Sequence, residues 1–170
     1  MNARTTLLVT ALGTAALAAP AIGMRPTTLY IWNASDSVPV GLYRLQPPGE
    51  LSVTDLVAVQ TPEPHASFLA DGGYLPRDVP MLKRVLALPG QTVCRSAYTI
   101  IVDDIAMGKA RARDSRGRSL PAWQGCLVIA EDELFLMNWR SENSFDGRYF
   151  GVTQRAAVIG HAQPVWTAEH

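Results

Sequence analysis

Residues 81–88 read Met-Leu-Lys-Arg-Val-Leu-Ala-Leu, a nearly continuous apolar run that predicts a buried β-strand with Lys83 inside it. A lysine in such a strand is either an edge residue whose amine reaches solvent or a buried amine with a chemical task. Pro89 and Gly90 follow soon after and end the strand. This stretch therefore indicates both the kind of fold and the residue around which a site would be built.

The rest of the chain contains similar short runs rich in Val, Ile, Leu and aromatic residues, separated by Gly, Pro and Asp. They predict further strands at 28–32, 40–45, 56–60, 98–102, 126–130, 134–139 and 156–160. Only residues 64–70 favour a short helix. We therefore expect a mostly β domain, barrel-like or sandwich-like, with an inserted lobe at about residues 95–126.

The composition excludes several classes of function. A chain of 170 residues is long enough for one domain with a real core, and with 48% hydrophobic and 18% charged residues it is not disordered. Its 15 basic and 15 acidic residues cancel, which argues against a nucleic-acid binder. Two cysteines and three scattered histidines do not have the ligand spacing of a zinc site.

The amino-terminal segment carries the signals of a membrane anchor. Residues 5–24 contain no charged side chain and lie between Arg4 and Arg25. At about 1.5 Å per residue, a helix of this length spans roughly the 30 Å of a bilayer core. The favoured interpretation is a signal-anchor over residues 1–24, with residues 25–170 exported to the periplasm. A cleaved signal peptide and a buried helix remain alternatives.

Cys94 and Cys126 suit an exported domain. In an oxidising compartment a lone pair of cysteines usually forms a disulfide. This one would tether the polar, arginine-rich run at residues 108–118. The alternative is two separate buried thiols.

The candidate chemistry is a serine nucleophile with a lysine base. The chain has no Gly-x-Ser-x-Gly motif, and its three histidines are badly placed for a Ser-His-Asp triad. The other known base for serine is a desolvated lysine, whose pKa of about 10.4 must fall by several units. Of the two lysines, Lys109 lies in a polar loop and Lys83 lies in the apolar run. Lys83 is therefore the candidate base.

Two serines offer the nucleophile. Residues 33–41 read Asn-Ala-Ser-Asp-Ser-Val-Pro-Val-Gly, so that Ser35 and Ser37 follow a predicted strand at a Pro/Gly turn. Serines at such positions usually form turns. A turn also exposes a hydroxyl together with a backbone N–H, which are the groups that a nucleophile and an oxyanion donor need.

Three motifs, in this order along the chain, resemble those of the type I signal peptidases. They are Ser37-x-Pro-x-Gly with Ser35 before it, Lys83-Arg84 followed by Leu-Pro-Gly at 88–90, and Asn-Ser-Phe-Asp-Gly-Arg-Tyr-Phe-Gly at 143–151. The proline two residues after Ser37, the two cysteines and the run 117–126 resemble more specifically the TraF branch, the peptidases of conjugative transfer systems that mature pilin precursors. The resemblance covers essentially the whole chain.

The resemblance implies a role for each matching residue. Ser37 matches the nucleophile, and Lys83 matches the general base. The Ser37 backbone N–H and the Ser35 hydroxyl match the oxyanion donors. Ser144 matches the serine that orients the lysine amine.

Two further residues match the family pattern, and two positions differ from it. Asp146 and Arg148 match a structural ion pair that supports the loop of Ser144. Val38 stands where ordinary signal peptidases have methionine, and residues 137–140 read Met-Asn-Trp-Arg where they have Gly-Asp-Asn-Arg. These departures concern substrate specificity and leave the serine and the lysine intact.

The resemblance also implies how a substrate peptide binds. The peptide would lie extended beside the strand that contains residues 81–85, adding main-chain hydrogen bonds as a further strand would. Small side chains, alanine above all, would enter shallow apolar pockets formed by Val38, Met81, Leu82 and Val85.

The implied function is that of a membrane-anchored serine endopeptidase, with a signal-peptidase-like coiled β-sheet and an amino-terminal transmembrane helix. Its expected substrate is an exported precursor, above all the pilin precursor of a conjugative transfer system, which TraF-type peptidases can also cyclise. The expected partners are the protein substrate and the inner membrane; no metal, cofactor or nucleic acid is implied. Two alternatives are a LexA-like serine–lysine autoprotease and a non-catalytic exported assembly subunit of a conjugation system.

Overall fold

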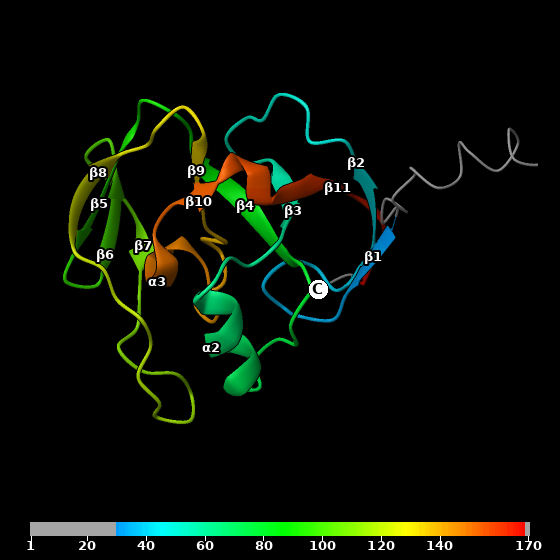
Figure 1. Ribbon diagram of the computed structural model, residues 1–170, viewed down its shortest axis with the longest axis horizontal. Coiled ribbons are helices and arrows are strands. Elements are labelled where there is room, and N and C mark those ends of the chain that lie inside the picture. Colours follow the sequence, from blue (N-terminus) through cyan, green and yellow to red (C-terminus); the bar gives the residue numbers. More distant parts are fainter. Residues whose placement is uncertain (1–29, 169–170) are drawn as a thin grey trace, which may run out of the picture.

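Two antiparallel β-sheets organise the part of the chain that the computed structural model describes, residues 30–168 (Figure 1). In this part the larger sheet has seven strands in the order β1-β2-β11-β3-β4-β9-β10. Their bounds are Tyr30–Asn33 (β1), Gly41–Gln46 (β2), Val158–Thr167 (β11), Leu56–Val59 (β3), Met81–Ala87 (β4), Glu133–Leu136 (β9) and Thr153–Gln154 (β10). The prediction of a mostly β fold is confirmed.

The smaller sheet forms a lobe, at the left of Figure 1, with the strand order β7-β6-β5-β8. Its strands are Ile105–Lys109 (β7), Thr99–Val102 (β6), Thr92–Ser96 (β5) and Gly125–Val128 (β8). A disulfide joins Cys94 and Cys126, which face each other across β5 and β8. The expected disulfide is thus present, and it links two strands that are already hydrogen-bonded neighbours.

Strand β11 comes last in the sequence of the described strands and yet lies inside the larger sheet. It pairs with β2 along one edge and with β3 along the other. Strands β1 and β2 therefore lie on one side of β11, and β3 and β4 lie on the other. Its pairing with β2 shifts between Pro164 and Trp166, as expected at a residue that has no N–H to donate.

Short helices connect the strands. Helix α2 (His65–Asp71) corresponds to the helix predicted at 64–70. Helix α3 (Gly147–Phe150) begins after Asp146, whose side chain accepts a hydrogen bond from the Arg148 N–H and so caps the helix. A 3₁₀ turn, η2, covers Arg155–Ala157.

The sequence missed strands β5, β7 and β10, for physical reasons that differ. Strand β5 contains Arg95, which is only 2% exposed and donates a hydrogen bond to the Arg148 carbonyl, so that a charged residue interrupts its apolar pattern. Strand β7 reads Ile-Ala-Met-Gly-Lys and looks like the start of a polar run. Lys109 therefore ends a strand instead of lying in the loop, although its side chain is exposed as predicted. Strand β10 has two residues only, too few to show a pattern.

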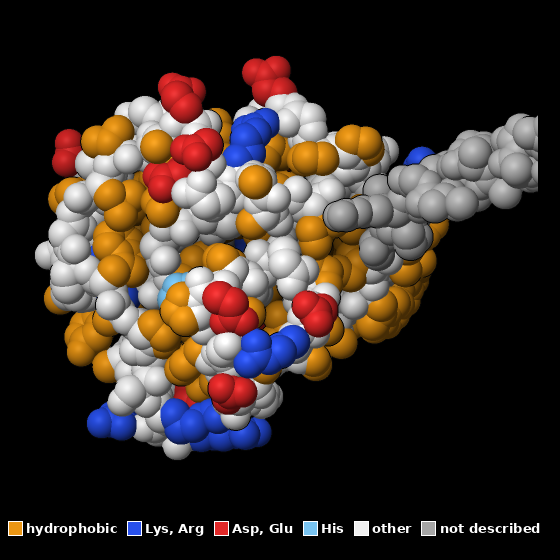
Figure 2. Space-filling view, in the orientation of Figure 1, with side chains coloured by type: hydrophobic (Ala, Val, Ile, Leu, Met, Phe, Trp, Pro, Cys, Tyr) orange, Lys and Arg blue, Asp and Glu red, His pale blue; other side chains and the backbone are white. Residues whose placement is uncertain are grey.

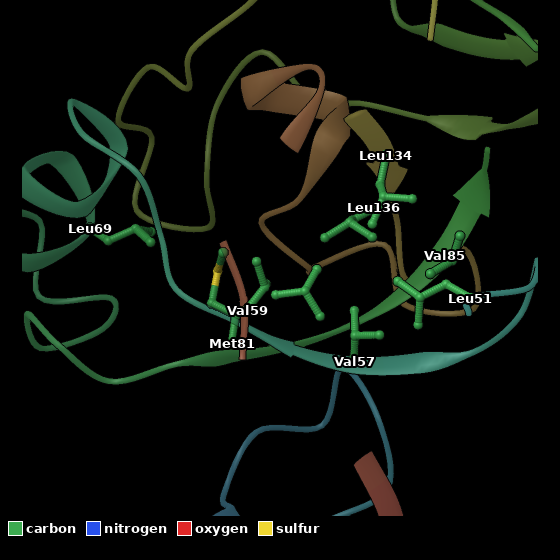
Figure 3. Packing of buried hydrophobic residues seen from close by; sticks show 9 residues of the cluster. Leu51, Val57, Val59, Leu69, Met81, Val85, Leu134 and Leu136 are labelled. Atoms are coloured by element: carbon green, nitrogen blue, oxygen red, sulfur yellow. The ribbon is translucent and has the colours of Figure 1, made fainter. Parts of the chain in front are cut away.

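Strand β4 is buried on both faces, which explains its nearly continuous apolar sequence. Met81 and Val85 belong to the hydrophobic cluster of Figure 3, to which α2 contributes Leu69. Leu82 packs on the opposite face, into a second cluster. Because side chains alternate along a strand, Lys83 shares the face of Met81 and Val85.

The predicted membrane anchor at residues 1–24 lies outside the described residues. Within residues 30–168, no helix has the length and apolar character needed to cross a bilayer. The anchor and the export of residues 25–170 stay predictions.

Candidate active site

Lys83 is a buried amine in the middle of β4. Its side chain is 5% exposed, and its Nζ donates a hydrogen bond to Ser144 Oγ at 2.9 Å. Burial lowers the pKa of Lys83 from 10.5 to about 8; the negative charge of Asp146 opposes this shift, and the positive charge of Arg148 adds to it. A substantial fraction of the amine is therefore neutral near physiological pH and able to accept a proton.

Ser35 and Ser37 lie in the turn between β1 and β2, with their Oγ atoms 3.1 Å apart. Both serines line a cavity of about 450 Å³, and Lys83 and Ser144 line the same cavity. Among the described residues, the amine of Lys83 is hydrogen-bonded to Ser144 and not to Ser37. The structure thus brings the four residues into one cavity and holds them in two hydrogen-bonded pairs.

The side chain of Asn33, the last residue of β1, holds the serine turn. Its Oδ1 accepts hydrogen bonds from the Ser35 N–H at 3.2 Å and from Ser35 Oγ at 2.9 Å. Its Nδ2 donates to the carbonyls of Ser35, Val38 and Pro39 at 2.8, 3.0 and 3.1 Å. Sequence reasoning gave Asn33 no role, although an asparagine directly before a tight turn is a signal for side-chain bonds to the turn's backbone.

Asp146 and Arg148 form a buried ion pair next to Ser144, with 0% and 1% of their surfaces exposed. Arg148 Nε contacts Asp146 Oδ1 and Nη2 contacts Oδ2, each at 2.8 Å. The same Nη2 donates to the carbonyls of Ser141 and Ser144 at 2.7 and 3.1 Å. The guanidinium therefore fixes the loop from which Ser144 reaches Lys83.

A second asparagine, Asn138, holds β4 on both sides of Lys83. Its Oδ1 accepts from the Arg84 N–H and its Nδ2 donates to the Leu82 carbonyl, both at 3.0 Å. Its own N–H donates to Asp146 Oδ2 at 3.0 Å. Asn138 thus links the strand of Lys83 to the turn of the ion pair. The family pattern marked this position as a departure, but its partners on β4 lie 54 and 56 residues away, so the sequence did not show its role.

One wall of the cavity is apolar. The larger hydrophobic residues that line it come from β1, α2, the segment before β4, β4 itself and the loop before α3: Ile31, Trp32, Leu69, Tyr74, Leu75, Val79, Met81, Leu82 and Phe145. Within residues 30–168, no group of three or more His, Cys, Asp or Glu residues is arranged to hold a metal ion.

The four residues expected to contact a substrate are placed differently from one another. Met81 and Leu82 line the cavity. Val38 lines a smaller neighbouring cavity that also borders Ser37. Val85 is fully buried in the cluster of Figure 3, where a peptide does not reach it.

Comparison with known proteins gives matches along almost the whole chain. The family model described as signal peptidase, peptidase S26, matches residues 2–167. A conjugal transfer protein TraF of Agrobacterium fabrum is 34% identical over 150 residues, which cover 81% of this chain and 82% of the relative. A plasmid transfer protein TraF of Escherichia coli is 34% identical over 148 residues, covering 79% of this chain and 81% of the relative.

Among solved structures, a signal peptidase I from Enterococcus faecalis V583 matches with a TM-score of 0.40. It is 19% identical, and the match covers 67% of this chain and 97% of that one.

Proposed function

This chain belongs to the signal peptidase family, peptidase S26, and on that premise we propose that it is a serine endopeptidase with Ser37 as nucleophile and Lys83 as general base. The observation that carries the proposal is the buried amine of Lys83, whose pKa falls to about 8 in the cavity that Ser37 also lines. A serine peptidase without a histidine base needs such an amine.

In the proposed reaction, the neutral Lys83 amine takes the proton of Ser37 while Ser37 Oγ attacks the carbonyl carbon of the scissile bond. The Ser37 hydroxyl must first turn from Ser35 toward Lys83, and the Ser35 hydroxyl must turn from Asn33 Oδ1 toward the oxyanion. The oxyanion then accepts hydrogen bonds from the Ser35 hydroxyl and the Ser37 N–H.

The second half of the reaction returns the proton. Protonated Lys83, held by Ser144, gives its proton to the leaving amine, and the acyl group stays on Ser37. Water then attacks the acyl-enzyme and releases a new carboxyl end. An amine that replaces this water would form an amide instead, and if it came from the same chain the product would be a ring.

The substrate that we propose is an exported precursor of a conjugative transfer system, above all its pilin. Two relatives that match most of this chain are named as conjugal and plasmid transfer proteins, which supports a role in conjugation. A membrane-inserted precursor would reach the enzyme at a fixed depth, because both would share one bilayer.

We also propose that residues 1–24 anchor the enzyme in the inner membrane, with the catalytic domain in the periplasm. Exposed aromatic residues on β1 and β11 support this location: Trp32 and Trp166 are 57% and 56% exposed and stack with ring centroids 5.8 Å apart. Tyr30, also exposed, shares the face of Trp32. Figure 2 shows hydrophobic side chains along the right-hand edge of the molecule, where β1 and β2 lie in Figure 1. Tryptophan and tyrosine favour the membrane interface.

Intact mass spectrometry of a co-encoded pilin precursor tests the proposed function. The wild-type protein should shorten the precursor, and Ser37→Ala should leave it whole, whereas Ser96→Ala, on an exposed strand end of the lobe, should behave as wild type. A linear product is one water heavier than a ring, so the same spectrum identifies the product. A precursor left whole by the wild-type protein would contradict a peptidase and favour a non-catalytic assembly subunit.

The rate of cleavage is expected to rise with pH. Because Lys83 acts in its neutral form and its pKa is about 8, the active fraction grows as the pH rises through that value and levels off above it. The check is a profile of kcat/KM from about pH 6 to about pH 10, with one ionisation on the acid side. A flat profile across this range would rule out Lys83 as the base.

Substrates with alanine before the cleaved bond should be cut faster than those with phenylalanine. Met81 and Leu82, which line the cavity, are 8% and 5% exposed because they belong to the packed strand β4. A bulky residue must displace this packing, at a cost of about 1–3 kcal/mol, which corresponds to roughly a fivefold to 150-fold loss of kcat/KM. Equal kcat/KM for the alanine and phenylalanine substrates would contradict the prediction that the cavity accepts only small side chains.

A further inference from the structure

A second, smaller cavity of about 180 Å³ adjoins the proposed nucleophile. It shares Asp36 and Ser37 with the larger cavity, and its other walls include Arg84, Trp139 and Arg140. We refer to it as the Arg84–Arg140 pocket. Two guanidinium groups therefore stand beside a serine that the proposed reaction uses.

The Arg84–Arg140 pocket has unused capacity to bind an anion. The exposed Arg140 side chain makes no hydrogen bond and no ion pair within residues 30–168. Arg84 donates from Nη1 to the Thr54 carbonyl at 3.0 Å, which leaves most of the five N–H groups of its guanidinium available. Asp36 is the single acidic residue among those that line the pocket, and it forms an ion pair with neither arginine in the described chain. The pocket thus carries an excess of one positive charge.

Two arginines of the loop on the other side of the site already have carboxylate partners. Figure 2 shows Lys and Arg side chains gathered at the bottom of the view, over the long loop between β7 and β8. In that loop Arg111 pairs with Glu142 at 2.8 Å, and Arg118 pairs with Asp114 at 2.7 Å. Arg111 and Asp114 line a third cavity, which borders Ser144 but not Ser37. Arg113 and Arg116 of the same loop form no ion pair within residues 30–168, but they line neither cavity that borders Ser37, so the unpaired positive charge next to the nucleophile is that of the Arg84–Arg140 pocket.

The position of the pocket indicates which part of a peptide it meets. A peptide cut at Ser37 has one segment on each side of the scissile bond, and both segments must lie in space that borders Ser37. The larger cavity contains Lys83, the Ser35 hydroxyl and an apolar wall, so it suits the segment that becomes the acyl group. The Arg84–Arg140 pocket is then the space for the segment that leaves.

We propose that the Arg84–Arg140 pocket binds a carboxylate in the leaving segment of the substrate, within about three residues of the cleaved bond at 3.3 Å per residue. This inference rests on the proposed function. A carboxylate is the anion that an unmodified peptide offers, and the fork of a guanidinium matches its two oxygens. The carboxylate comes either from an acidic side chain or from the carboxyl end of a short leaving segment.

Three peptides with a common acyl side test the proposal on the full chain in detergent micelles. Their three-residue leaving segments contain glutamine with an amidated end, glutamate with an amidated end, or glutamine with a free carboxyl end. We expect kcat/KM to be about tenfold higher for at least one carboxylate peptide than for the neutral one, and the faster peptide identifies the source. In Arg140→Gln, the ratio of kcat/KM between the carboxylate peptide and the neutral peptide should fall from about ten to about one. In the wild-type protein, the same ratio should decrease at high salt.

The control variant is Arg113→Gln, which removes an exposed arginine of the basic loop that lines neither cavity next to Ser37. It should keep the full preference for the carboxylate peptide. Equal kcat/KM for the three peptides with the wild-type protein would overturn the inference and leave the proposed peptidase intact. A preference that survives in Arg140→Gln would overturn it as well.

A binding measurement separates this inference from the proposed function. The same three leaving segments, as free tripeptides, are titrated into the Ser37→Ala protein while the indole N–H signal of Trp139 is followed by NMR. A carboxylate tripeptide should shift this signal more than the neutral one, and the difference should vanish in Ser37→Ala/Arg140→Gln. If the wild-type protein cuts no peptide and this difference is seen, the pocket stands and the proposed function fails. If the tripeptides give equal shifts, the pocket does not bind carboxylates.

Discussion

Replacing Lys83 by arginine is expected to reduce kcat by about 10³-fold or more, because general-base assistance is lost. A guanidinium does not release its proton in the accessible pH range, so it cannot take the proton of Ser37. The environment that lowers the pKa of Lys83 to about 8 is unfavourable for a permanent charge, so the variant also loses stability. Product formation is measured by intact mass, and folding is followed by thermal unfolding of the same preparation.

Two controls separate lost chemistry from lost structure. Lys83→Met removes the charge and keeps an unbranched apolar chain of similar length, so it should fold and remain inactive. Lys109→Arg changes the only other lysine, an exposed residue at the end of β7, and should cleave as the wild-type protein does. Cleavage by Lys83→Met at a wild-type rate would remove Lys83 from the mechanism.

Breaking the buried ion pair is expected to cause the largest loss of stability. Asp146→Asn keeps the shape of the side chain but leaves the Arg148 guanidinium, 1% exposed, without a counter-charge. Removing one partner of such a pair costs about 3–5 kcal/mol in the free energy of unfolding. Chemical denaturation measures this loss. A loss below about 1 kcal/mol would show that the ion pair contributes little to the stability of the fold.

The same variant should also move the pH profile in a defined direction. Because the charge of Asp146 raises the pKa of Lys83, its removal lowers that pKa, and the acid limb of kcat/KM shifts to lower pH. The control is Glu142→Gln, which breaks the exposed pair with Arg111. It should cost less than about 1 kcal/mol and leave the pH profile in place. An unchanged profile in Asp146→Asn would mean that its charge does not act on Lys83.

The sequence predicted those features that depend on local pattern. Strand β4 was predicted within one residue because it is buried on both faces, and an isolated lysine inside it could be singled out from two lysines in all. The turn at Ser35 and Ser37 was visible from its Pro and Gly residues. Each of these signals lies within ten consecutive residues.

The features that the sequence did not show depend on contacts between distant segments. Asn138 looked like a departure from a family pattern, and its bonds on both sides of Lys83 exist only because the end of β9 lies against β4. Asn33 is the exception: its bonds reach only residues 35–39, and its place directly before a tight turn was a local signal that sequence reasoning did not use. The Arg84–Arg140 pocket combines residues from three separate stretches of the chain, and no spacing along the sequence predicts it.

The place of β11 has a consequence for when the enzyme can become active. Ser37 lies between β1 and β2, Lys83 lies on β4, and within residues 30–168 the sheet connects β2 to β3 and β4 only through β11. During synthesis, and during the export proposed above, both residues emerge more than seventy residues before residues 158–167 do. Pairings between segments so far apart in the chain form late, after the intervening chain has been made. A partly synthesised chain therefore holds the proposed nucleophile and base in two unconnected halves, and under the proposed export it would become a catalyst only on the side of the membrane where strand β11 arrives.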